Sequence, residues 1–117
     1  RANLTEAILT DANLKNAFLV GANIQKADLQ RANLEGADMA GVKLRNAHLQ
    51  NANLKKVDLR RADLEHADFS KANLSSANFT GAKMSEGLFI GADLTGSNMD
   101  SADTTDTQFK GAIGFKG

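Results

Sequence analysis

The sequence contains no cysteine, which excludes disulfides, thiolate metal sites and cysteine nucleophiles together. Proline, tryptophan and tyrosine are also missing, and all six aromatic residues are phenylalanine. No apolar run is long enough to cross a bilayer, and the N-terminus lacks the charged-then-apolar order of a signal peptide. Neither charge dominates, with 14 lysines and arginines against 14 aspartates and glutamates, so net charge alone identifies no partner. We therefore expect no membrane contact and favour a cytoplasmic location.

The most prominent feature of the sequence is a strict five-residue repeat. An apolar residue, usually leucine, stands at almost every fifth position from Leu4 to position 114, which makes 23 repeats without an insertion. Alanine stands two positions before each of these centre residues, and Asn or Asp usually lies between the two. Other residues replace the alanine only at Val42, Val57, Gly87, Ser97 and Thr107.

A five-residue period fits neither regular secondary structure. In a helix, five residues turn the chain by about 140° beyond a full turn, so the leucines would circle the axis without forming a face. In a continuous strand, an odd period would send successive leucines to opposite sides. The pattern favours a chain that bends once per repeat, with alanine and leucine inside and the two polar positions, rich in Gly, Asn, Ser, Thr and Lys, at the corner.

These residues resemble the A-(D/N)-L-x-x motif of the pentapeptide-repeat family, from residue 2 to about residue 112. The resemblance implies an all-β fold, a right-handed quadrilateral β-helix with four repeats in each coil. Coils of about 20 residues stacked ~4.8 Å apart would give nearly six coils and a rod roughly 29 Å long. We expect a single domain over residues 1–117, with an irregular last coil.

A coil of that length would place each residue above the one 20 positions earlier, and the resulting columns are chemically regular. Asparagines that could hydrogen-bond up one column stand at Asn13, Asn33, Asn53 and Asn73, followed by Asp93. Charges alternate along other columns at Lys43, Asp63, Lys83 and Asp103, at Lys15, Glu35 and Lys55, and at Arg45 and Glu65. Opposite charges on neighbouring strands stabilise by about 0.2–1 kcal/mol each, so the alternation supports the coil length independently.

The inner residues change along the chain. Leu, Ile and Met fill the first coils, and we predict that Phe69, Phe89 and Phe109 stack on one inner side while Phe79 fills the opposite side. Stacked rings should lie roughly 5 Å apart. Thr104, Thr107 and Gly114 weaken the last coil, which should fray unless it is capped.

The histidines and the glycosylation-like segments, which could suggest a chemical function, are better explained by structural roles. His48 would stack between Asp28 and Asp68, which we interpret as a charge ladder because a metal site or a relay needs further ligands or a nucleophile nearby. His66 is expected at a solvated corner. Three segments match the glycosylation pattern, but the repeat itself produces them for packing reasons: Asn3-Leu4-Thr5, Asn73-Leu74-Ser75 and Asn78-Phe79-Thr80.

Two features of the predicted surface could serve binding. Residues 42–61 carry six cations against one acid, Asp58, and residues 62–101 carry two cations against six acids. We call the six cations the basic belt and expect them to wrap around the four faces: Lys43, Arg45, Lys55, Lys56, Arg60 and Arg61. Apolar residues that should point outward near the two ends are candidate contacts with a capping segment or a second copy: Ile8, Phe18, Val20, Leu88, Ile90, Ile113 and Phe115.

The sequence contains no glycine-rich phosphate loop, no carboxylate pair in a cleft and no Ser/His/Asp set. We therefore predict a non-enzymatic structural or protein-interaction scaffold without cofactor or metal, whose partner is a protein rather than a nucleic acid. The alternative, which the resemblance implies for some family members, is a DNA mimic that interacts with a type II topoisomerase such as gyrase. Such mimicry rests on a strongly negative rod, whereas this chain has zero net charge and a basic belt.

Overall fold

The structure, a computed structural model, describes residues 2–115. Within these residues there is neither a helix nor a strand longer than one residue, and the β-structure consists of single residues that bridge in parallel to the next coil. Each bridge joins residue n to residue n+20, from Asn3 with Asn23 to Asp93 with Ile113. The predicted all-β coil of four repeats is therefore confirmed.

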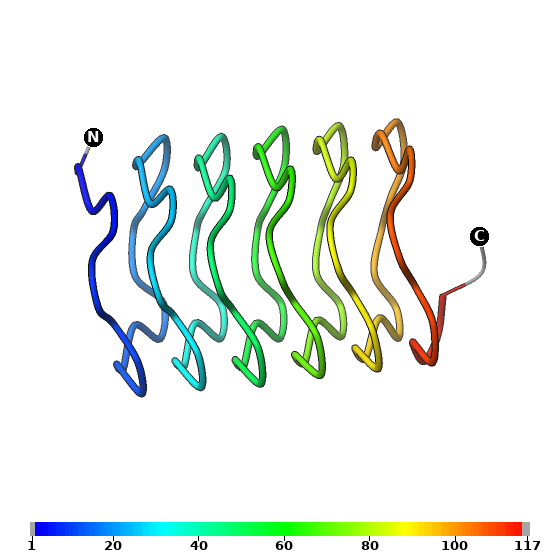
Figure 1. The fold of residues 1–117 in the computed structure, drawn as a ribbon, viewed down its shortest axis with the longest axis horizontal. Helices are drawn as coiled ribbons and strands as arrows, with labels where there is room; N and C mark the ends of the chain where they lie inside the picture. The colour runs from blue at the N-terminus through cyan, green and yellow to red at the C-terminus, as the bar shows by residue number, and fades with distance from the viewer. Residues whose placement is uncertain (1, 116–117) are drawn as a thin grey trace.

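The coils stack side by side along the longest axis, from the first described residues at one end to the last at the other (Figure 1). The stack measures 33 × 23 × 21 Å, close to the predicted rod of roughly 29 Å. In every repeat three residues form a side and the next two form a corner. The middle residue of each side makes the bridges, so its column defines that side of the rod.

The four sides are named here by their bridging residues. Side I carries Asn3, Asn23, Lys43, Asp63, Lys83 and Asp103. Side II carries Ile8, Asp28, His48, Asp68, Leu88 and Gln108. Side III carries Asn13, Asn33, Asn53, Asn73, Asp93 and Ile113. Side IV carries Phe18, Asp38, Asp58, Asn78 and Asn98.

Every corner closes with the same turn. The N–H of the residue after the corner donates to the carbonyl of the preceding centre residue, as Ala7 N does to Leu4 O at 3.0 Å. The second corner residue has a positive φ, between 57° and 72° in every corner from Glu6 to Gly111, which is typical of a type II turn. Fifteen of these residues are not glycine, although left-handed backbone costs other residues about 1–2 kcal/mol. The stacked coils therefore impose a conformation that local propensity disfavours.

Backbone hydrogen bonds join each coil to the next. A centre residue donates its N–H to a bridging residue of the following coil, as Leu54 N does to Asn73 O at 2.7 Å. The bridging residue donates in the other direction, to an alanine position of the preceding coil, as Asn53 N does to Ala32 O at 2.9 Å. The second corner residue also donates to the following coil. This network fixes the register of the columns, because each repeat can pair only with its equivalent in the neighbouring coil.

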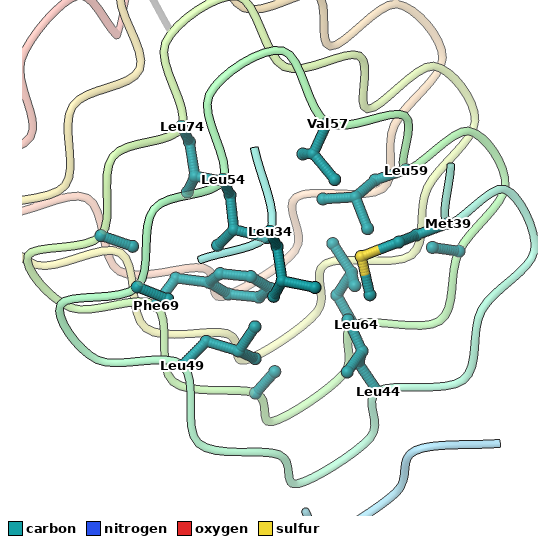
Figure 2. Packing of buried hydrophobic residues seen from close by; sticks show 14 of the residues in the cluster. Leu34, Met39, Leu44, Leu49, Leu54, Val57, Leu59, Leu64, Phe69 and Leu74 are labelled. Carbon is teal, nitrogen blue, oxygen red and sulfur yellow. The ribbon is translucent and has the colours of Figure 1, made fainter. Parts of the chain in front are cut away.

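The interior is filled by the alanine and centre positions. From Ala22 to Leu94 all of these positions are buried, and among residues 2–115 no polar or charged residue is buried. Figure 2 shows Leu34, Met39 and Phe69 pointing from different sides toward the middle of the coil. The inside of the rod is therefore an apolar core rather than a binding site.

Two departures from the repeat have structural reasons. Gly87 stands at an alanine position where an added Cβ would lie 3.0 Å from Met84 O and 3.1 Å from Cε1 of Phe89, so glycine makes room for the ring. Thr107 stands at the equivalent position one coil later, and its hydroxyl donates to Met84 O at 2.7 Å. The hydroxyl is therefore paired although it points toward the core.

The predicted phenylalanine column is confirmed. Phe69 and Phe89 stack with ring centroids 4.8 Å apart, and Phe89 and Phe109 stack at 5.6 Å. Phe79, from the opposite side, meets Phe89 edge-on at 5.9 Å. The rings thus form one continuous aromatic cluster through the C-terminal half of the core.

The last coil is closed by the chain itself. Gly114 stands at a centre position with φ of 77°, and Phe115 turns inward so that its ring stacks on Phe109 at 3.7 Å. The prediction that Phe115 faces outward is therefore wrong, because the left-handed glycine breaks the repeat and redirects the next residue. An added Cβ at Gly114 would lie 2.6 Å from Thr95 Cα, so this turn needs glycine.

The asparagine column does not form the expected amide-to-amide ladder within the described residues. Each side-chain oxygen instead accepts from the backbone N–H two residues ahead, as Asn53 Oδ1 does from Lys55 N at 3.2 Å and Asn73 Oδ1 does from Ser75 N at 3.0 Å. In the glycosylation-like segments the hydroxyl joins the same oxygen, at 2.8 Å for Ser75 and 2.6 Å for Thr80 on Asn78. This local bond explains why Asn-x-Ser and Asn-x-Thr recur.

Candidate interaction surface

The histidines lie on the outside of the rod. His48 is exposed on side II, and its bridges place it between Asp28 and Asp68 as predicted. His66 lies at a corner, with Nε2 3.5 Å from the carboxylate of Glu86. Among residues 2–115 no three His, Cys, Asp or Glu side chains are grouped so that they could hold a metal ion. Over the same residues there is no helix able to span a membrane.

The basic belt occupies corners more than faces. Only Lys43 lies on a side, side I, and the other five cations are corner residues. None lies on side II or at the corner formed by residues 50–51. The belt therefore extends around the rod at three of the four corners and leaves the corner formed by residues 50–51 without a cation. Its members lie at the corners that bound sides IV and I, apart from Lys43, which lies on side I.

Four cations of the belt occupy two neighbouring corners of the same coil, and we call them the cation cluster. They lie at the two ends of the side IV segment centred on Asp58, and all four are exposed: Lys55, Lys56, Arg60 and Arg61. The sequence identified these residues individually, but their grouping was missed. The available signal was the five-residue spacing, which places both pairs at corners.

Only one member of the cation cluster is neutralised within the described residues. Arg60 donates from Nη2 to Asp58 Oδ2 at 2.7 Å and from Nε to Asp58 Oδ1 at 2.9 Å. The hydrogen bonds from this guanidinium lower the pKa of the Asp58 carboxyl below its usual value. Within residues 2–115, Lys55, Lys56 and Arg61 have no carboxylate within 4.0 Å.

The surroundings of the cation cluster differ toward the two ends of the rod. In the following coil the matching positions are neutral and polar, with Ser75, Ser76, Asn78, Thr80 and Gly81. In the preceding coil they are Glu35, Gly36, Asp38, Ala40 and Gly41. The cluster is therefore bounded by two acids on one side and by hydroxyl and amide groups on the other.

Some of the opposite charges in the predicted columns form ion pairs. Arg45 contacts the carboxylate of Glu65, as predicted, and its Nη2 lies 3.5 Å from Asp63 Oδ2. Arg31 forms a bidentate pair with Asp11, from Nε to Oδ1 at 3.0 Å and from Nη2 to Oδ2 at 3.1 Å. These hydrogen bonds lower the pKa of the Asp11 carboxyl. In contrast, Lys43 and Lys83 bridge to aspartates on side I without a carboxylate within 4.0 Å among residues 2–115.

The outward apolar residues do not gather into one patch. Ile8 and Phe18 are 82% and 79% exposed but lie on opposite sides, II and IV. Ile90 is 41% exposed at a corner and Ile113 is 61% exposed on side III. The side chains of Val20 and Leu88 are half-buried. A role for these residues in contacts with a cap or a second copy stays a prediction.

The fold of this solenoid resembles those of solved relatives. A pentapeptide repeat protein, Rfr23, from the cyanobacterium Cyanothece 51142 is 34% identical over 78% of this chain, with a TM-score of 0.76. A pentapeptide repeat protein from Nostoc PCC 7120 is 35% identical over 92% of this chain and 84% of its own, with a TM-score of 0.55. One from the Arabidopsis thaliana thylakoid lumen is 28% identical over 80% of this chain, with a TM-score of 0.56.

The chain spans 63% of the length of the Cyanothece protein and 62% of that of the Arabidopsis protein. Comparison with curated proteins gives no match. The family model for pentapeptide repeats matches residues 1–36, 37–76 and 72–113, which is nearly the whole sequence. With this match and the four-sided coil, the chain belongs to the pentapeptide-repeat family.

Proposed function

We propose that this chain is a non-enzymatic protein-interaction scaffold whose cation cluster holds an acidic segment of a partner protein. The observation that carries the proposal is the grouping of four exposed cations on two neighbouring corners, three of them without a carboxylate within 4.0 Å among residues 2–115. Uncompensated like charges held this close favour any ligand that brings carboxylates to them.

The backbone supports a rigid display of these charges. Lys56 and Arg61 have φ values of 61° and 57°, fixed by a turn at each corner and by hydrogen bonds to the next coil. The neighbouring positions Leu54, Val57 and Leu59 are fully buried, with at most 1% exposure. A partner therefore meets charges whose backbone is ordered before binding, which lowers the entropic cost of association.

A short extended acidic segment fits this site better than a nucleic acid does. Such a segment could cross side IV from Lys55 to Arg61 along the direction of the coil. A polyanion running along the rod would meet Glu35 and Asp38 one coil away. Duplex-binding proteins commonly neutralise about 6–10 phosphates, whereas the cluster offers four cations, one of them already paired with Asp58.

The alternative of DNA mimicry has the wrong charge placement. A mimic needs a continuous negative side to compete for a basic groove. On this rod the cation cluster interrupts sides III and IV at their shared corner, and Lys43 interrupts side I. The charge arrangement therefore supports an acidic partner rather than a basic one.

The proposal can be tested with a fluorescein-labelled decapeptide of alternating glutamate and serine at low ionic strength. We expect the double variant Lys55→Gln, Lys56→Gln to weaken binding by roughly threefold to thirtyfold, because it removes two exposed charge contacts. Asp58→Asn should tighten binding, because it removes the carboxylate that neutralises the Arg60 guanidinium. The asparagine keeps a side-chain oxygen that can accept from the backbone N–H of Arg60.

The matched control is Lys26→Gln, Lys71→Gln, which makes the same charge change at two other exposed corners. It should alter binding by about twofold or less, through net charge alone. Equal weakening by both double variants would contradict the proposal, as would the absence of binding. Tighter binding of a DNA duplex than of the peptide, with the same dependence on Lys55 and Lys56, would replace it with a nucleic-acid site.

A further inference from the structure

Side I of the rod has a charge pattern that is complementary to its own inverted copy. Its outward column reads Lys43, Asp63, Lys83, Asp103, and successive members bridge from coil to coil. In the described residues neither lysine has a carboxylate within 4.0 Å, so both ammonium groups are available to another molecule. Reading this column backwards exchanges every positive charge for a negative one.

The two corners that border side I follow the same gradient. At one corner Arg45 lies in the third coil, where it pairs with Glu65 of the fourth coil, and Glu86 and Asp106 follow in the fifth and sixth coils. At the other corner Arg60 and Arg61 are followed two coils later by Asp100. The whole strip therefore changes from basic in the third coil to acidic at its C-terminal end.

We infer that side I is a self-association surface, on which a second copy of this chain docks antiparallel. With a two-fold axis between the levels of Asp63 and Lys83, Lys43 faces Asp103 of the second copy and Asp63 faces its Lys83. At ~4.8 Å per coil the column spans about 14 Å, and all four members find an opposite charge. A parallel arrangement would place like charges together, so the charges specify the orientation.

No other side of the described rod has this property. Side III is uncharged from Asn13 to Asn73, side II carries Asp28 and Asp68 around His48, and side IV carries two aspartates. A second copy on side II or side IV would meet charge of its own sign. The self-complementary column is therefore confined to side I.

The size of the surface predicts a weak association. A body of 33 × 23 × 21 Å offers a flat side of at most about 760 Å² per partner, slightly below the ~800 Å² of a standard interface. Because the contact is charged and exposed at its rim, salt should weaken it strongly. We expect reversible dimers at low ionic strength that dissociate as salt is added.

The test is sedimentation equilibrium at low and at high ionic strength with two complementary variants. Lys43→Gln, Lys83→Gln leaves only aspartates in the column, and Asp63→Asn, Asp103→Asn leaves only lysines while retaining the oxygens that accept from Glu65 N and Thr105 N. Each variant alone should dimerise at least tenfold more weakly than the parent. A mixture of the two should dimerise again, because one column is now negative and the other positive.

The control is Lys15→Gln, Lys71→Gln, which removes two exposed cations from corners that do not border side I and should dimerise like the parent. Circular dichroism melting should show that all variants fold. A parent that stays monomeric at every ionic strength overturns the inference, as does a mixture that fails to recover association. Orientation is checked by cysteine cross-linking, since the chain has no cysteine: Asn46→Cys should cross-link to Thr105→Cys and not to itself.

Discussion

At the scale of the residue, the corners hold the backbone in a left-handed conformation that residues other than glycine disfavour. Lys56 and Arg61 have φ values of 61° and 57°, where glycine or asparagine would be expected. The sequence predicted corners at these positions from their polar composition, but it could not predict the sign of φ. That sign comes from hydrogen bonds between coils, which local propensity does not contain.

Glycine substitutions should separate backbone strain from crowding. Gly41 has φ of 66° with open space around an added Cβ, so Gly41→Ala should lower the free energy of unfolding by about 1 kcal/mol. Gly114→Ala should also push Thr95 away and detach Phe115 from Phe109. Urea unfolding measures the first effect, and amide exchange of Leu94, which donates to Ile113 O at 2.7 Å, reports the second. Unchanged exchange at Leu94 in the Gly114 variant would show that the last turn is not packed as described.

The Asp58–Arg60 pair predicts a small acid dependence of stability. Arg60 lowers the pKa of Asp58 in the folded protein. The pair therefore stabilises the fold fully at pH values above the unfolded-state pKa near 3.8. This stabilisation is lost as the pH falls through the lower pKa of the folded state. At pH 7 the free energy of unfolding of the parent should exceed that of Asp58→Asn by less than about 1 kcal/mol, since the pair is partly exposed. The difference should shrink as the pH is lowered below 3.8. Urea unfolding at pH 7 and in acid gives the comparison, and a difference that grows in acid would contradict the sign.

At the scale of the element, one coil is the unit of structure, and much of it could be predicted from sequence. The resemblance to pentapeptide-repeat proteins implied the four-repeat coil, and the alternating columns supported it. That coil length was then enough to predict the stacked rings of Phe69 and Phe89, which lie 4.8 Å apart. An irregular last coil was expected, but the inward direction of Phe115 could not be predicted, because it depends on a single left-handed turn at Gly114. The pairing of Arg60 with Asp58 was also missed, although Asn-x-Thr segments use the same two-residue spacing.

The packing of a coil predicts very different effects for adjacent residues. Leu54 is fully buried, so Leu54→Lys should abolish cooperative folding by burying a charge without a partner. Lys55 is an exposed corner residue, and Lys55→Glu should cost less than about 1 kcal/mol. Circular dichroism melting of the two variants measures both effects. A Leu54→Lys protein that melts like the parent would mean that this position is not inside the coil.

At the scale of the whole molecule, the charge placement favours the proposed interaction scaffold over a DNA mimic. The basic belt lies in the third coil, and the acids of coils four and five cover only about 10 Å of rod at strand spacing, short of a duplex footprint. We therefore expect no inhibition in a gyrase supercoiling assay with a molar excess of this protein. We also expect no rescue when a quinolone is present. Either effect at low micromolar protein would favour the mimic and argue against the acidic-partner proposal.

Every surface argument depends on residue n lying next to residue n+20, and one measurement tests this directly. Scalar couplings across hydrogen bonds, detected by NMR, connect an amide nitrogen to the carbonyl carbon that accepts its proton. The structure predicts a coupling from Leu54 N to Asn73 C, and from Asn53 N to Ala32 C, because these bonds measure 2.7 Å and 2.9 Å between nitrogen and oxygen. Couplings to carbonyls shifted by one whole repeat from these positions would show a coil of three or five repeats, and the columns, the cation cluster and side I would all be wrong.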